Sequence, residues 1–175
     1  MQQIGFFALY YALVVALIGA AISAAAGITG SRRFLHTSRF SAYTTTGAIA
    51  VASSVLMHAL LTHDFSIQYV SAFSDTSMPL FYLIGAFWGG QAGSLLFWTS
   101  VVAISMSACV YINRDSYQDF MPWVTAISLS ILSGLLLILV FASNPFEGFS
   151  IIDDPTKGKG LNPLLQTPKM VMHPP

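Results

Sequence analysis

Long apolar stretches alternate with short polar segments along this chain, and four of the stretches contain no Asp, Glu, Lys or Arg. An α-helix rises 1.5 Å per residue, so about 20 apolar residues cross the hydrocarbon layer of a bilayer. Each of the four stretches reaches that length. The pattern therefore predicts four transmembrane helices, at residues 4–26, 42–61, 93–112 and 120–142.

The apolar run that leads into the third span is longer than one simple span, and Gly89, Gly90 and Gly93 interrupt it. Glycine lacks a side chain, so it permits a corner or a close contact between helices. No strand precedes these glycines, so they do not suggest a nucleotide-binding loop. We expect a short interfacial helix at 80–88, then a corner, and close helix contact at the glycines.

The composition supports a membrane protein, because 55% of the residues are hydrophobic and only 8% are charged. Soluble domains carry about 25% charged residues. The predicted fold is an all-α integral membrane bundle, residues 1–142, followed by a polar, turn-rich loop, residues 143–175. Three leucines are expected to press this loop onto the bundle: Leu161, Leu164 and Leu165.

The distribution of positive charge predicts how the bundle is oriented. The first connection contains Arg32, Arg33 and Arg39, whereas the second, residues 62–79, contains no Lys or Arg. Loops on the cytoplasmic side are enriched in these residues, so the first connection is expected there and both termini on the periplasmic side. The net charge is zero, which gives no reason to expect nucleic acid as a partner.

Few residues offer chemistry. The single cysteine, Cys109, lies in an apolar run and cannot form a disulfide within the chain. Asp153 and Asp154 lack further ligands at metal-binding spacing and are typical of a solvated turn. His58 is an ionisable residue in a predicted span and so a functional candidate. The alternative, which its place near the end of that span favours, is a histidine that simply bonds to water or to a helix carbonyl.

His173 lies in the sequence His-Pro-Pro, where proline restricts the residue before it to extended geometry. A neutral imidazole held in this way can bind a metal or haem iron through a ring nitrogen. The alternative is an ordinary loop histidine without a special task. One ring nitrogen is not a site, so spacing alone favours that alternative.

Four stretches of the chain form recognisable motifs: DFSIQYV at 64–70, FWGGQAGSLLFW at 87–98, SNPF at 143–146 and GKGLNPLLQTPKMVMHPP at 158–175. Together they resemble the CcmF-type cytochrome c haem lyases, large multi-span proteins of cytochrome c maturation. The resemblance corresponds to an N-terminal portion of that family, ending at its His-Pro-Pro motif. Two departures stand out: Ala92 replaces the usual glutamate of the family, and His63 stands where the family often has an acid.

The resemblance implies that His173 is an axial ligand to haem iron on the periplasmic side. It also implies an N-terminal part or split subunit of a haem lyase that handles b-type haem for thioether attachment to apocytochrome c. The implied partners are the remainder of the lyase, a haem chaperone, apocytochrome c and the lipid bilayer. The implied location is the bacterial inner membrane or its organellar equivalent. No residue here is expected to act as a catalytic acid or base.

Two other functions stay open at this point. The chain could be a four-helix membrane scaffold or accessory subunit without catalytic activity. A piece of a transporter fits less well, because the spans lack the buried charges and paired broken helices that such proteins use. Haem in the purified complex that depends on His173 would distinguish a lyase component from a scaffold.

Overall fold

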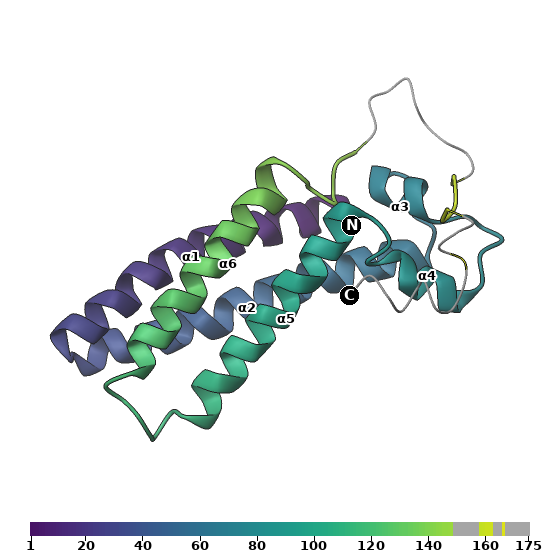
Figure 1. Ribbon diagram of the computed structural model, residues 1–175. Helices are drawn as coiled ribbons and strands as arrows, with labels where there is room; N and C mark the ends of the chain where they lie inside the picture. Colours follow the sequence, from purple (N-terminus) through teal and green to yellow (C-terminus); the bar gives the residue numbers. More distant parts are fainter. Residues whose placement is uncertain (149–157, 163–165, 167–175) are drawn as a thin grey trace.

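Four long helices lie side by side, and two short helices lie together at one end of them (Figure 1). This computed structural model describes residues 1–148, 158–162 and 166. The long helices are α1 (Gln2–Thr29), α2 (Arg32–Leu61), α5 (Gln91–Ile112) and α6 (Met121–Phe141). The short helices are α3 (Gln68–Phe73) and α4 (Leu80–Ala86).

The four long helices are each long and apolar enough to cross a membrane, which confirms the predicted all-α membrane fold. They form a closed ring in which α1 contacts α2 and α6, and α5 contacts the same two helices. Helix α2 begins at Arg32, ten residues before the apolar stretch from 42. No proline or glycine interrupts residues 32–42, so the helix continues beyond its apolar part.

The bundle core combines leucines with small and hydroxyl residues. Leu9, Leu56 and Leu129 are fully buried, and a Cβ at Gly19 would lie 2.6 Å from the Cβ of Ser41. Such small residues let helix backbones approach closely in a membrane. Hydroxyl pairs add hydrogen bonds between helices: Ser23 with Ser38 at 2.6 Å, Thr46 with Ser107 at 2.7 Å, and Ser53 with Ser100 at 2.9 Å.

The two ends of the bundle are built differently. One end carries α3, α4, residues 143–148 and residues 158–162, and we call it the cap end. The N-terminus lies there as well, because Gln2 Nε2 donates a hydrogen bond to the Phe146 carbonyl at 2.9 Å. The opposite end holds the α1–α2 and α5–α6 connections, and we call it the loop end.

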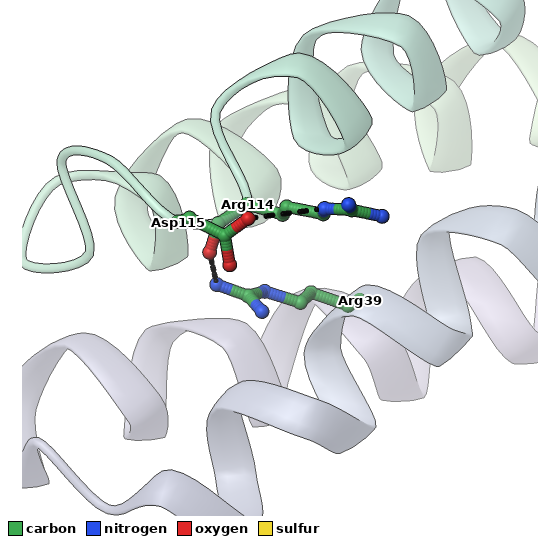
Figure 2. A network of polar contacts seen from close by, with 3 residues as sticks. All are labelled: Arg39, Arg114 and Asp115. Carbon is green, nitrogen blue, oxygen red and sulfur yellow. Dashed lines mark hydrogen bonds and ion pairs between the residues drawn. The ribbon is translucent and has the colours of Figure 1, made fainter.

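The loop end contains a small exposed polar network (Figure 2). Arg39, from α2, donates a hydrogen bond to the backbone carbonyl of Arg114. Arg114 Nε lies 3.2 Å from Asp115 Oδ2, and the two side chains are 54% and 82% exposed. This network joins α2 to the connection between α5 and α6.

Helix α4 lies within the segment predicted to form a short helix, but it ends at Ala86 rather than Trp88. Helix α3 was not predicted, since residues 62–79 were expected to form a loop. Its six residues are too few to show a helical period, and Tyr69 and Val70 are buried on it. The second connection is therefore a packed part of the cap end.

Candidate functional site

Tyr69 is the centre of the cap end. Its side chain is 7% exposed, and its hydroxyl lies 2.9 Å from the Ala86 carbonyl and 3.1 Å from the Phe87 carbonyl. The same oxygen accepts a hydrogen bond from the Gly90 N–H at 3.1 Å. Burial raises the pKa of the Tyr69 hydroxyl, so it stays protonated and donates to these carbonyls. Tyr69 thereby ties α3 to the corner between α4 and α5.

The glycines of the corner make this contact possible. A Cβ at Gly93 would lie 1.9 Å from the Phe87 carbonyl oxygen and 2.1 Å from the Tyr69 hydroxyl. A Cβ at Gly90 would lie 2.3 Å from the ring of Phe73. Neither position has room for a side chain. The expected close contact at the glycines is therefore confirmed, although the contacting helix is the unpredicted α3.

Residues 158–162 cross the C-terminal end of α3, and we call them the return segment. The Lys159 N–H donates to the Ser71 carbonyl at 2.7 Å, and the Gly160 N–H donates to the Ser74 carbonyl at 3.1 Å. Gly160 has φ +75°, a conformation that suits glycine. Leu161 is 3% exposed and packs against Gly89. Leu161 thus presses onto the bundle as the sequence predicted, whereas Leu164 and Leu165 lie outside the described residues.

Residues 143–148 leave α6 and are fixed in a similar way, and we call them the exit segment. Phe146 is 1% exposed, and its ring occupies the space beside Gly5 of α1. The Phe146 N–H donates to Asn144 Oδ1 at 3.0 Å. The Gln68 N–H donates to the Glu147 carbonyl at 2.9 Å, so the exit segment also joins α3. Both described segments that flank residues 149–157 are therefore held on the cap end.

An open hollow of about 290 Å³ lies between α3, the start of α5 and the exit segment. Gln68, Glu147 and Asn144 bring amide and carboxylate groups to its lining, while Ala72 and Ala92 are apolar. The family that this sequence resembles usually has a glutamate at the position of Ala92. The methyl group of Ala92 contributes no charge there, so Glu147 supplies the carboxylate of this hollow.

The predicted site residues are placed as follows. His173, the expected haem ligand, lies outside the described residues, as do Asp153 and Asp154. Gln166 is the last described residue, and its Nε2 donates to the Leu161 carbonyl at 2.8 Å. Among the described residues, no group of three His, Cys, Asp or Glu side chains could hold a metal ion.

The other candidate histidine, His58, and the non-candidate His63 differ in their surroundings. His58 is exposed on α2, and its ring makes no hydrogen bond to another described residue. His63 has φ +53°, and its Nε2 lies 3.0 Å from the Asp75 carbonyl. His63 therefore bridges the two ends of the α2–α4 connection, a structural role that the sequence did not indicate.

Sequence reasoning also missed Tyr69 and Phe146 as organising residues. Both are aromatic residues in polar connections rather than in the apolar spans. An aromatic residue in such a setting has a large apolar surface to bury, and this was the available signal. The partners of the two side chains, Gly93 and Gly5, are far away in the sequence and could not be inferred from spacing.

Comparisons with known proteins identify relatives over the whole chain. No protein-family model matches it. It is 34% identical over 175 residues to the cytochrome c-type biogenesis protein CcmF of Escherichia coli, covering 100% of this chain and 27% of that protein. It is 32% identical over 173 residues to the cytochrome c-type biogenesis protein ccl1 of Rhodobacter capsulatus, covering 99% and 26%.

A solved structure gives the same result. The fold matches a cytochrome c heme lyase CcmF with a TM-score of 0.76 and 25% sequence identity, covering 86% of this chain and 25% of that one. The chain thus spans about a quarter of the length of the relatives it matches, and it corresponds to their N-terminal part.

Proposed function

This chain belongs to the CcmF-type cytochrome c biogenesis proteins, and we propose that it acts as the N-terminal part, or a separate N-terminal subunit, of a membrane cytochrome c haem lyase. One observation carries the proposal: the similarity to CcmF extends over all 175 residues, including the segment with His173. The substrates are haem and an apocytochrome c. The reaction adds each cysteine S–H of the apocytochrome across a haem vinyl group, forming a C–S bond.

The role proposed for this chain is to hold haem rather than to move protons. A histidine ring nitrogen is a normal axial ligand of haem iron, and His173 would supply one such bond. A single histidine supplies one axial bond, and we assign the opposite axial ligand to a part of the lyase outside this chain. His173 would therefore form one half of a shared haem site.

The cap end would set the position of that histidine. The return segment is fixed to α3 by two backbone hydrogen bonds and by the buried Leu161, and Gln166 extends this order toward His173. His173, seven residues after Gln166, would then reach only a limited region near the cap end. Such restriction reduces the entropy that is lost when haem is bound.

The proposed location is the bacterial inner membrane or its organellar equivalent, with the cap end on the periplasmic side. The arginines support this orientation, because Arg32, Arg33, Arg39 and Arg114 all lie at the loop end. Positive residues are enriched on the cytoplasmic side of membrane proteins. The proposed partners are the remainder of the lyase, a haem chaperone and apocytochrome c.

Replacement of His173 tests the proposal. We expect His173→Ala, in the membrane-assembled lyase, to lower the haem content and the cytochrome c yield at least tenfold while the chain remains in the membrane. His63→Ala is the matched control, because it removes a cap-end histidine that is proposed to have no contact with haem. Unchanged haem content and cytochrome c yield in the His173 variant would refute the lyase role and favour a scaffold.

A further inference from the structure

A second hollow lies at the cap end, where the exit segment crosses the start of α1, and we call it the α1 hollow. Its volume is about 460 Å³, within the range of about 300–1,000 Å³ that is typical of ligand pockets. Its lining combines aromatic and polar residues: Phe6, Phe7 and Phe146 with Gln2, Gln3 and Glu147.

The α1 hollow has an apolar side and a polar side. Phe6 and Phe7 belong to the first turns of a helix that is long and apolar enough to cross the membrane, and Phe7 is 65% exposed. The apolar side is therefore within reach of lipid chains. Gln2, Gln3 and the exit segment lie at the end of this helix, where the hydrocarbon layer gives way to the headgroups.

The polar side of the hollow is held in place by the backbone. Gln2 Nε2 donates a hydrogen bond to the Phe146 carbonyl at 2.9 Å, and the Gln68 N–H donates to the Glu147 carbonyl at 2.9 Å. These bonds fix the exit segment to α1 and to α3. The exposed side chain of Glu147 lines both the α1 hollow and the hollow of about 290 Å³ beside α3.

Glu147 differs from the other described acidic residues of the cap end. Asp64 Oδ1 accepts a hydrogen bond from the Ser66 hydroxyl at 2.6 Å, and Asp75 Oδ2 accepts one from the Ser77 hydroxyl at 2.8 Å. The Glu147 carboxylate makes no hydrogen bond or ion pair with another described residue. It therefore offers a negative charge to a group beyond the described part of the chain.

Amide groups accompany this carboxylate. Asn144 lines the hollow beside α3 and is only 8% exposed. Its Oδ1 accepts the hydrogen bond from the Phe146 N–H, whereas its Nδ2 donates to no described residue. Gln3 and Gln68 bring further amides, each with two N–H donors, to the two hollows. The two hollows together combine one negative charge, several neutral donors and an apolar side.

We propose that the two hollows bind a phospholipid with a primary ammonium group, such as phosphatidylethanolamine. The ammonium N–H groups donate to the Glu147 carboxylate, the amides donate to the phosphate oxygens, and an acyl chain lies beside Phe7. Hydrogen bonds between charged groups are stronger than those between neutral ones. This inference rests on the membrane fold and the cap-end contacts and does not require the haem role of His173.

The carboxylate distinguishes between classes of amphiphile. Acidic phospholipids, fatty acids and the propionate groups of haem carry negative charge, so Glu147 repels them. A choline headgroup carries a positive charge but has no N–H to donate. The hollows should therefore prefer a primary ammonium headgroup to both an anionic and a choline headgroup.

Lipid competition tests this preference. The protein purified from membranes is mixed in detergent with equal amounts of phosphatidylethanolamine, phosphatidylcholine and phosphatidylglycerol, and bound lipid is measured by native mass spectrometry. We expect at least threefold more bound phosphatidylethanolamine than either other lipid. Glu147→Gln should remove this preference, whereas Asp64→Asn, which changes a cap-end acid outside the two hollows, should retain it.

Three results of the competition would overturn the inference. The first is a preference for phosphatidylglycerol, and the second is equal binding of the three lipids, which is also the result if another side chain of the protein neutralises Glu147. The third is a preference that survives Glu147→Gln or that Asp64→Asn removes to the same extent.

Photolabelling locates the bound lipid. Phosphatidylethanolamine with a photoreactive group in its acyl chain, near the glycerol, is added at a low fraction to phosphatidylcholine vesicles that contain the protein. We expect at least threefold more adduct at residues 2–7 than around Ile104 of α5 or Ile127 of α6, which are 60% and 61% exposed. Glu147→Gln should reduce the labelling to the level of these controls. Equal labelling of all three regions in the original protein would contradict a site at the α1 hollow.

Discussion

The cap end and the loop end close the same helical bundle by different means. At the cap end, buried groups from α1, α3, α5 and the exit and return segments contact one another, although they are far apart in the sequence. At the loop end, two short connections meet through an exposed arginine network. Specific long-range contacts are therefore concentrated at the end from which the chain leads toward His173, whereas the loop end only joins helices.

The largest expected loss follows removal of the aromatic ring that fixes the exit segment. Phe146→Ala should lower the free energy of unfolding by about 3–5 kcal/mol, because Phe146 is 1% exposed and its loss leaves a cavity beside Gly5. Thermal unfolding of the detergent-solubilised protein measures this change. A loss below about 1 kcal/mol would mean that the exit segment is not held on α1.

Overpacking the corner at the start of α5 should be slightly less damaging. Gly93→Ala is expected to cost about 3 kcal/mol, because the added methyl group meets a backbone carbonyl that cannot move freely. Gly134→Ala, with open space around its Cβ, is the control and should be neutral or slightly stabilising. Equal stability of both variants would show that α3 does not press on the corner.

Loss of the Tyr69 hydroxyl should have a moderate effect. Tyr69→Phe removes the hydroxyl that the buried Phe87 carbonyl and Gly90 N–H share, at a cost of about 2 kcal/mol, while the Ala86 carbonyl keeps its hydrogen bond from the Gly89 N–H. Limited proteolysis of the α3–α4 connection in membranes should then proceed faster than in the original chain. Unchanged cleavage would argue against Tyr69 as the tie between α3 and the corner.

The same hydroxyl predicts a dependence on pH. Its pKa is raised in the folded state, so the folded protein retains this proton after the unfolded chain has lost it. The stabilisation is complete below the unfolded pKa of about 10 and is lost as the pH rises above it. Thermal unfolding between about pH 9 and 11 should show a steeper loss of stability for the original chain than for Tyr69→Phe. Parallel curves would contradict this.

The smallest effect is expected at the loop end. Arg39→Ala removes a hydrogen bond from an exposed network and should cost less than about 1 kcal/mol. The same thermal unfolding measurement applies, at low and high salt. A loss as large as that of Phe146→Ala would erase the proposed difference between the two ends.

The helical spans were predictable because each is a long apolar run, and the runs lie within α1, α2 and α5 and over α6 with small differences at the ends. The close contact at Gly93 was also predictable, since glycine in an apolar run indicates close packing. Its partner Tyr69 was not, because six-residue α3 shows no periodicity. For His173, the sequence and the resemblance supply a role that remains a prediction, since this residue lies outside the described residues.

The connection between α1 and α2 consists only of Gly30 and Ser31, with Gly30 at φ 63° closing α1. Because the turn is so short, α2 cannot insert separately from α1 once α1 has formed. We expect the two helices to enter the bilayer as one hairpin during synthesis. The Ser23–Ser38 hydrogen bond near the turn would then form as the hairpin inserts, so that neither hydroxyl meets the lipid alone.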